Sequence, residues 1–221
     1  MREVVLDTET TGLSPTEGHR IIEIGCVEVM NRAPTGRTFH TYLNPERDIP
    51  EDAVRVHGLT EAFLAAHPLF AQVKAAFLTF IGDDPLVIHN AAFDLKFLNA
   101  ELSAVGADSL PEERAVDTML LARRRFPGAP ASLNALCARF GIDSSARSFH
   151  SALLDATLLA DVYLELTGGR QQGLALEAPS VRQIAAPQRH PRPARPHAPT
   201  AAELAAHAAC LDKITDPIWR R

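Results

Sequence analysis

Two carboxylates end the first apolar segment of the chain. Asp7 and Glu9 follow the apolar run 4–6 and are spaced two residues apart. Because side chains on a strand alternate between its faces, both acids are expected to point to the same side. Adjacent carboxylates disfavour each other's ionisation, and a shared divalent cation such as Mg²⁺ or Mn²⁺ removes that cost. The pair therefore indicates a metal site, with two solvated acids at a strand end as the alternative.

A third acid follows another short apolar strand. Residues 86–89 are predicted to form this strand, and the helical pattern that starts at Ala91 places Asp94 in its first turn. Ligand sites in open α/β sheets lie outside the carboxyl ends of strands. Asp94 is therefore expected at the same site as the first two acids, although a first-turn Asp also suits the helix dipole alone.

The remaining candidates are a histidine and an aspartate five residues apart, His150 and Asp155. At roughly 100° per residue, positions i and i+5 of one helix lie about 140° apart, so the two could not share a site within one helix. If His150 lies in the loop before a helix over 151–166, it can reach across the helix end to Asp155. A lone histidine is more often structural, but this one accompanies a set of acids.

Carboxylates combined with a histidine whose unperturbed pKa lies near neutrality suit one class of reaction. Two divalent metal ions about 3.5–4 Å apart can clamp a phosphodiester and stabilise its attacking and leaving oxygens. A histidine can then take the proton of the attacking water. The set of Asp7, Glu9, Asp94, His150 and Asp155 therefore predicts metal-dependent phosphodiester hydrolysis.

The elements that must position these residues follow from hydrophobic periodicity and turn residues. Strands are predicted over 2–7, 20–30, 38–43 and 86–89, with turns near Gly18 and over 33–36. Helices are predicted over 69–81, 91–105, 116–126, 133–140 and 151–166. This order indicates an α/β fold in which an antiparallel meander joins parallel strands in a mixed sheet flanked by helices.

The amino-acid composition of the chain changes after the predicted domain over 1–169. Residues 177–199 are rich in Pro and Arg and contain few large apolar groups, which predicts a flexible linker. A helix-forming pattern returns over 201–214 and is followed by Trp219, the only tryptophan. We interpret residues 200–221 as a docking segment for another protein, with a helix that folds back on its own domain as the alternative.

Composition limits where the protein is expected to work. The chain of 221 residues is 46% hydrophobic, yet it has neither an apolar stretch of membrane-spanning length nor a basic and apolar leader. Its cysteines are isolated, which is typical of a reduced, cytoplasmic compartment, and no membrane partner is expected. Residues 1–169 are acidic overall, so contact with nucleic acid should be restricted to a few nucleotides where metal ions supply positive charge.

Three segments in this order resemble the exonuclease motifs of the DEDDh family of 3′–5′ exonucleases: DTETTG at 7–12, HNAAFD at 89–94 and HSALLDA at 150–156. The resemblance extends over nearly the whole chain and is greatest to the epsilon, or proofreading, subunits of bacterial DNA polymerase III. The segments that carry this extension are VHG at 56–58, FPG at 126–128, SLNALCARFGID at 132–143, AELAAHAACLD at 202–212 and IWRR at 218–221. It implies a ribonuclease H-like fold with a flexible C-terminal extension.

The resemblance also implies a role for each matching residue. Asp7, Glu9 and Asp155 should hold one divalent ion and contact the substrate, Asp94 should complete the site of a second ion, and His150 should be the general base. The terminal nucleotide should be contacted by Thr8, Thr10, Gly12, Asp52, His57, Asn90 and Phe93, with Asp52 at its sugar. For His57, a structural histidine that caps a helix turn is the alternative.

Two partner-binding segments are implied as well. Residues 170–176 resemble a short motif that binds the beta sliding clamp, with Gln171, Leu174 and Leu176 as its anchors. A helix-end spacer explains the same residues. Residues 200–221 should bind the catalytic alpha subunit of the polymerase, through Leu204, Leu211 and Trp219. The linker would then hold the exonuclease near the polymerase at high effective concentration.

The expected activity is removal of mismatched nucleotides from single-stranded or frayed 3′ DNA ends during replication. A mispaired end unstacks at lower cost, so a site for single strands selects errors without reading sequence. An RNA-trimming exoribonuclease of the same superfamily is one alternative. The other is an adaptor that joins polymerase and clamp.

Overall fold

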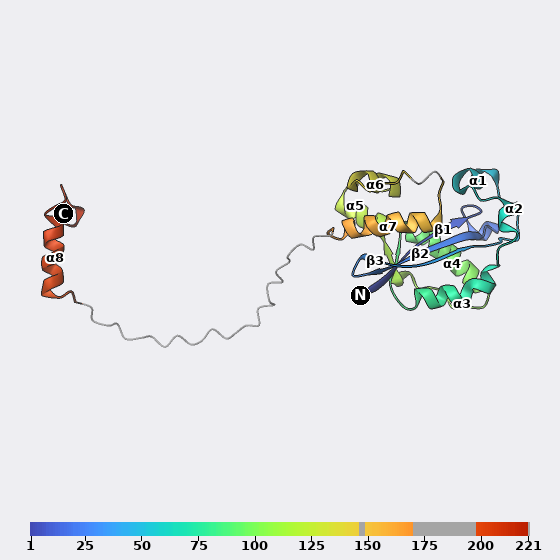
Figure 1. The fold of residues 1–221 in the computed structure, drawn as a ribbon, viewed down its shortest axis with the longest axis horizontal. Helices are drawn as coiled ribbons and strands as arrows, with labels where there is room; N and C mark the ends of the chain where they lie inside the picture. The colour runs from blue at the N-terminus through green and yellow to red at the C-terminus, as the bar shows by residue number, and fades with distance from the viewer. Residues whose placement is uncertain (146–148, 170–197, 221) are drawn as a thin grey trace. The chain divides into compact units, whose positions relative to one another are not determined.

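The computed structural model describes residues 1–145, 149–169 and 198–220. The chain divides into two units, Met1–Leu174 and Ala175–Arg221. Figure 1 shows a sheet with helices on both faces in the first unit and the helix α8 in the second. Among the described helices, none has the length and apolar character that crossing a membrane requires.

The first unit is built on a five-stranded sheet of order β3-β2-β1-β4-β5. Its strands are β1 (Arg2–Thr10), β2 (Ile21–Met30), β3 (Ala33–Tyr42), β4 (Leu86–Ile88) and β5 (Ala115–Asp117). The first three pair antiparallel, and β4 and β5 run parallel to β1. The expected mixed sheet, an antiparallel meander joined to parallel strands, is therefore confirmed.

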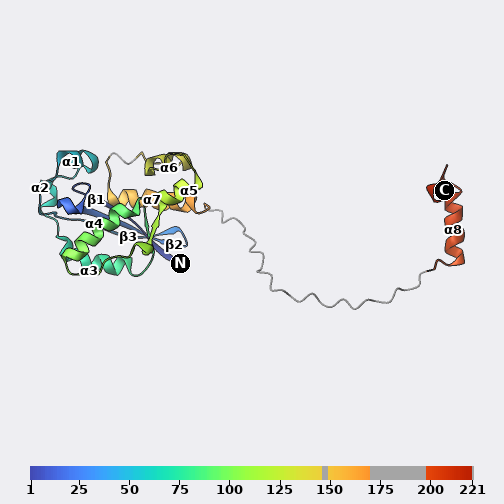
Figure 2. The same cartoon turned by 180° about the vertical axis from the view of Figure 1, so that it is seen from behind.

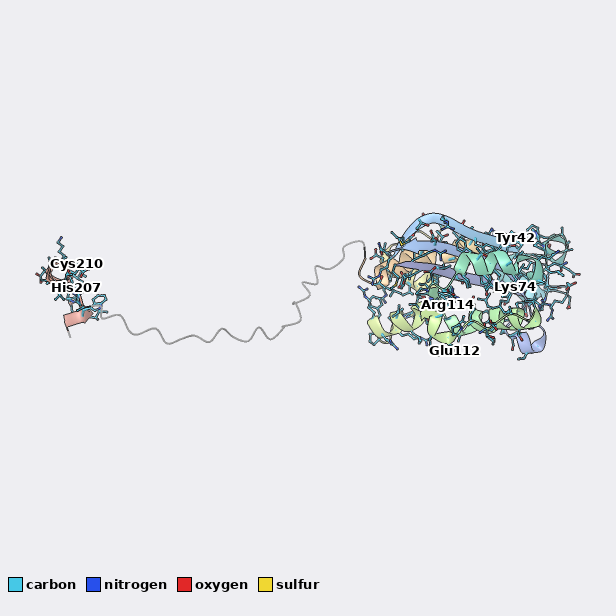
Figure 3. All side chains as sticks on the ribbon, turned by 90° about the horizontal axis from the view of Figure 1, so that it is seen from below. Tyr42, Lys74, Glu112, Arg114, His207 and Cys210 are labelled. Atoms are coloured by element: carbon cyan, nitrogen blue, oxygen red, sulfur yellow. The ribbon has the colours of Figure 1, made fainter. Side chains whose placement is uncertain are left out.

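Helices cover both faces of the sheet, as Figures 1 and 2 show from opposite sides. One face carries α5 (Thr118–Arg125), α6 (Leu133–Phe140) and α7 (Ala152–Leu166), and the other carries α3 (Phe70–Ile81) and α4 (Ala91–Ala104). The short helices α1 (Glu51–His57) and α2 (Glu61–Leu64) lie between β3 and α3 in the chain, and the 3₁₀ turns are η1 (Pro15–Glu17) and η2 (Glu112–Arg114). Arg114, labelled in Figure 3, donates from Nη2 to the carbonyl of Ile81 at the end of α3.

The alternation of β1 sorts its side chains between the two faces. Val4 and Leu6 join the core cluster under α3 and α4, and Val5 joins the cluster under α7. Residues of odd number on β1 therefore face α7. This face includes Asp7 and Glu9, which pair across the strands with Gly25 and Glu23 of β2.

The second turn of the meander differs from the prediction. The chain reverses at Asn31 and Arg32, which have φ of 53° and 69°, and β3 starts at Ala33 within the segment predicted to turn. Two consecutive residues with positive φ make a tight hairpin turn that usually contains Gly. Because this turn uses Asn and Arg, the sequence pattern placed it over 33–36 instead.

Some short elements were not predicted. The first residues of the helix predicted over 116–126 belong to β5, and Asp117 ends that strand and caps α5 by accepting from the amides of Met119 and Leu120. Helices α1 and α2 lie in a segment for which no element was predicted. Elements of three to seven residues are too short for a periodic pattern to be recognised.

The second unit contains α8 (Ala201–Leu211) and the short turn η3 (Ile218–Arg220). Thr200 and Glu203 form a capping box at the start of α8, and the helix ends before Ile214, where the prediction placed its end. Leu204 and Trp219 are exposed, whereas Leu211 is buried. The predicted clamp motif over 170–176 and most of the predicted linker over 177–199 lie outside the described residues.

Candidate active site

A cavity of about 500 Å³ opens beyond the carboxyl ends of β1 and β4. It brings together the four predicted carboxylates and the predicted base, Asp7, Glu9, Asp94, His150 and Asp155. Thr8, Asn90 and Phe93, which were predicted to contact the nucleotide, also line it. This position, at the ends of adjacent parallel strands, is where ligand sites in open α/β sheets occur.

Asp94 is held by the strand that carries the first two acids. The chain turns from β4 into α4 at Asn90, which has φ of 66°, and Asp94 lies in the first turn of α4. The amide and hydroxyl of Thr8 both donate to Asp94 Oδ1, at 3.1 Å and 2.7 Å. Burial raises the pKa of Asp94 to about 7, and the hydrogen bonds from Thr8 oppose that shift. A cation bound beside Asp94 would favour its charged form.

His150 lies in the loop immediately before α7, as its pairing with Asp155 requires. Its Nδ1 atom is 3.5 Å from Asp155 Oδ2, although five residues separate the two in the chain. Glu9, His150 and Asp155 each contribute one ligand atom to a group in which all atoms lie within 4.8 Å of one another. Carboxylate oxygens in this arrangement are ligands that Mg²⁺ and Mn²⁺ prefer, so the donor set fits a divalent cation.

Helix α1 supports the residues next to this histidine. The His150 amide donates to the carbonyl of Val56 at 3.1 Å. The ring of Phe149 packs against Gly58, where an added Cβ would lie 3.2 Å from the ring and where φ is +74°. Gly58 therefore allows both the left-handed end of α1 and the close approach of Phe149.

His57 ends α1 and lies outside the lining of the cavity. Its ring is buried, and Nδ1 accepts a hydrogen bond from the amide of Leu59 at 3.0 Å. Burial lowers the pKa of His57, and the neighbouring His150 lowers it further. The Nδ1 contact is the one that the helix-capping alternative expects, whereas Nε2 is buried without a hydrogen-bond partner among the described residues, and the nucleotide contact stays a prediction.

Three other predicted nucleotide contacts also lie outside the cavity lining: Thr10, Gly12 and Asp52. The hydroxyl of Thr10 donates to the carbonyl of Gly12. An added Cβ at Gly12 would lie 2.4 Å from the ring of His19, so this glycine makes room for that ring. The Asp52 side chain is 88% exposed and pairs with Arg55 on the surface of α1.

The cavity also has lining residues that the sequence did not indicate: Leu13, His89, Met119, Ser132, Leu133 and Asn134. Leu13 is 78% exposed. Because it directly follows the first motif, its position in the sequence could have identified it as a lining residue. His89 begins the second motif, and its Nδ1 atom lies 2.9 Å from the hydroxyl of Thr118. The others belong to α5 and the start of α6, which only the tertiary fold brings to the site.

Known proteins resemble this chain at the level of sequence and of fold. Residues 4–163 match the family model RNase_T, described as exonuclease. The chain is 46% identical to DNA polymerase III subunit epsilon of Rickettsia prowazekii, with 97% of each chain covered. It is also 46% identical to the protein of that name from Escherichia coli K12, with 99% of this chain and 97% of the relative covered.

Solved structures agree with this match. The exonuclease X complex with 5′ overhanging duplex DNA has a TM-score of 0.60 at 27% identity, and the match covers 75% of this chain and 90% of that chain. The nuclease domain of 3′hExo, a DEDDh family member bound to rAMP, shares the fold with a TM-score of 0.63 at 21% identity. The predicted ribonuclease H-like fold and family are confirmed. The chain belongs to the exonuclease family of DNA polymerase III epsilon subunits and is a divalent-metal-dependent 3′–5′ exonuclease.

Proposed function

We propose that this exonuclease removes mispaired nucleotides from the 3′ ends of DNA primers as a subunit of a replicative DNA polymerase. The observation that carries the proposal is the convergence of Asp7, Glu9, Asp94, His150 and Asp155 on one cavity. The similarity to epsilon subunits extends over nearly the full chain and so includes the segment after the exonuclease unit. Relatives of that length and name support replication rather than RNA trimming as the setting.

Two divalent ions, Mg²⁺ or Mn²⁺, would be held by the four carboxylates. Asp7, Glu9 and Asp155 would hold one, and Asp94 would complete the site of the other. When bound, the ions would neutralise charge on the phosphodiester and lower the pKa of the attacking water. Glu9, Asp94 and Asp155 are buried, and burying three acids together is costly without such a counter-charge.

His150 would take the proton from that water as its oxygen attacks phosphorus. The bond from phosphorus to the 3′ oxygen of the preceding nucleotide then breaks, and that oxygen leaves as a hydroxyl once it is protonated. The products are a 5′-mononucleotide and a strand shortened by one residue. The His150 side chain is 47% exposed at the edge of the cavity, so it can pass the proton on to solvent.

Thr8, Asn90 and Phe93 would contact the terminal nucleotide, because they line the same cavity as the acids. Thr10, Gly12, Asp52 and His57 would contribute only if the substrate reached beyond that cavity. The exposed Leu13 is a further candidate for contact with a base. A cavity of about 500 Å³ has the size typical of small-ligand sites, which suits one frayed nucleotide better than a paired duplex end.

The segment after the exonuclease unit would provide the partner contacts. Leu204 and Trp219 are exposed, and large apolar side chains in that position are typical of protein-binding surfaces. The partner would be the alpha subunit of the polymerase. Gln171, Leu174 and Leu176 would bind the beta clamp, and the complex would act in the cytoplasm.

A primer-excision assay tests the activity. With Mg²⁺, the wild type should release 3′-terminal nucleotides faster from a mismatched than from a matched DNA primer, and Asp7→Ala should release almost none. An RNA primer of the same sequence should be degraded more slowly. Equal rates for wild type and Asp7→Ala would falsify the proposal, and a preference for RNA would favour the exoribonuclease alternative.

Deleting residues 200–221 tests the polymerase contact separately. The shortened chain should keep its activity on free primers and lose its binding to the alpha subunit, measured by gel filtration of the mixed proteins. A complex that survives the deletion would show that the contact lies elsewhere. The adaptor alternative would be favoured by wild-type binding to both partners without nucleotide release.

A further inference from the structure

We propose that Glu23 is a positioning residue for His150 in the hydrolysis described above, and this proposal rests on that function. Glu23 lies on β2 directly opposite Glu9 and is 1% exposed. It faces α7, as Glu9 does, and it does not line the cavity. The question is why a buried carboxylate stands beside a cluster that is already acidic.

The contacts of Glu23 lead directly to the residue after His150. Glu23 Oε1 accepts a hydrogen bond from the hydroxyl of Ser151 at 3.0 Å, and His40 Nε2 lies 2.7 Å from the same oxygen. Glu23 Oε2 is buried and has no hydrogen-bond partner among the described residues. A buried carboxylate with one unsatisfied oxygen is unfavourable for stability, so stability alone does not explain Glu23.

Ser151 supplies the second observation. It stands at the N-cap of α7, where a serine hydroxyl normally accepts a hydrogen bond from a backbone amide of the first turn. Here the hydroxyl makes no capping bond and donates to Glu23 instead. The structure therefore uses the cap residue to hold the chain at His150 rather than to stabilise the helix end.

The contact completes the support around the histidine. On the N-terminal side of His150, Phe149 packs on Gly58, and the amide of His150 donates to the carbonyl of Val56. On the other side, the bond to Glu23 holds Ser151. Because a displacement of about 1 Å of a reacting group can cost about 100-fold in rate, loss of this tie should affect turnover.

The fold does not need Glu23 to keep α7 on the sheet. At Gly25, two residues further along β2, an added Cβ would lie 2.3 Å from the backbone of Ala152 and Leu153, so the first turn of α7 rests directly on the strand. A second buried glutamate, Glu3, accepts from Tyr163 near the other end of α7 at 2.7 Å. Glu3 is thus a matched control, because it makes the same kind of tie far from His150.

The test compares Glu23→Ala and Glu3→Ala in the Mg²⁺ primer assay, with the melting temperature of each variant measured. Glu23→Ala should lower kcat about 10- to 100-fold and leave KM for the primer unchanged. This range is typical of residues that orient a functional side chain without contacting the substrate. Glu23→Gln keeps an acceptor for Ser151 and should restore most of the turnover. Glu3→Ala should melt at a lower temperature and keep its kcat within about twofold of the wild type, well below one decade in rate.

A double-mutant cycle separates positioning from a structural effect. In an His150→Ala background, adding Glu23→Ala should cause no further loss of kcat. The same fold loss in both backgrounds, or an equal loss in Glu3→Ala, would overturn the proposal.

If Glu23→Ala does not fold, Ser151→Ala removes the same bond and should also lower kcat. Unchanged turnover in Ser151→Ala would likewise overturn the proposal. Wild type that releases no nucleotides would refute the proposed function itself, whereas an active wild type with equally active Glu23 and Ser151 variants would refute only this inference.

Discussion

The two ends of α7 meet the sheet through similar hydrogen bonds in different surroundings. Near its C-terminal end, Tyr163 donates a hydrogen bond to the buried Glu3. Burial is the larger cause and this bond the second cause of a pKa of Tyr163 raised to about 12. At its N-terminal end, Ser151 donates to the buried Glu23, next to His150 and Asp155. One end is surrounded by apolar core residues, and the other opens onto a cavity lined with acids.

The difference shows where the molecule accepts unfavourable electrostatics. At the closed end, the buried Glu3 is paired with Tyr163, which is the usual condition for burial of a polar group. At the open end, several carboxylates lie close together, and Asp94 has a strongly raised pKa. Such perturbed groups gather at functional sites because a ligand or cation supplies the missing counter-charge. The closed end should therefore affect stability, and the open end should affect activity.

The largest expected effect comes from removing an acid at the open end. Asp155→Asn should reduce nucleotide release by about 100- to 1,000-fold, because Asp155 would hold the divalent ion that stabilises the developing charge. Its melting temperature should not fall, since the change relieves repulsion with Glu9. Asp161→Asn, on the same helix and outside the active-site cavity, is the control and should keep its activity. If Asp155→Asn melted at a lower temperature and kept its activity, the open end would affect stability rather than activity.

A change beneath the open end should affect both properties. Gly25→Ala would place a methyl group 2.3 Å from the backbone of Ala152 and Leu153, so the first turn of α7 must move. Overpacking of this kind costs about 1–3 kcal/mol of unfolding free energy, and turnover should fall as well. Urea unfolding and the primer assay measure the two effects.

Gly36 is the control for that change, because nothing lies within 4 Å of its added Cβ although its φ is +88°. Gly36→Ala should lose about 1–2 kcal/mol of unfolding free energy from backbone strain and none of its turnover, so turnover distinguishes it from Gly25→Ala. Gly25→Ala with full stability and activity would mean that α7 does not rest on β2 as tightly as the structure indicates.

The closed end should respond in stability alone. Tyr163→Phe removes the donor to Glu3 and leaves a buried carboxylate oxygen without that bond, a loss of about 1–3 kcal/mol of unfolding free energy. Release of nucleotides at 25 °C should be unchanged. Denaturant titration gives the first quantity and the primer assay the second. If turnover fell with stability, the two ends would be coupled through the helix.

The smallest effect is a pH dependence of the cation-free protein. Because burial raises the pKa of Asp94 to about 7 from an ordinary 3.8, the folded state binds this proton more tightly than the unfolded state between those values. The contribution of Asp94 to stability is therefore greatest at low pH and is lost as pH rises through about 7. In EDTA, the melting temperature of the wild type relative to that of Asp94→Asn should therefore be higher at pH 5 than at pH 8.

Stabilisation by added Mg²⁺ should show the opposite dependence on pH. A cation requires the ionised carboxylate, so its stabilisation of the wild type should increase from pH 5 to pH 8. The Asp94→Asn variant should show a weaker increase, because the amide does not titrate. Stabilisation by Mg²⁺ that was equal at both pH values would contradict a proton on Asp94 in the cation-free protein.

Much of the site could be predicted because its signals are local. The two-residue spacing of Asp7 and Glu9 determines that they share a face, and the helical period shows that His150 must precede α7. Asp94 was placed correctly because a strand led directly into a helix. Where the signals were weak, the prediction of the fold was wrong, as at the hairpin turn of Asn31 and Arg32.

The lining of the cavity was harder to predict because it depends on which loops converge. Asn134 at the start of α6 and Met119 in α5 line the cavity although neither belongs to a motif. Thr10 and Gly12 belong to the first motif and yet make contacts within their own loop. Membership of a motif shows that a residue is near a site, whereas side-chain direction depends on packing.

The sequence by itself determined the acids, their faces and the elements that carry them, since alternation and helical period are properties of neighbouring residues. The tertiary structure alone decided which of these residues meet. Glu23 and Ser151 are separated by 128 positions, and only the docking of α7 onto Gly25 of β2 brings them within 3.0 Å. No local pattern contains that contact, because it depends on the distance between a helix and a sheet.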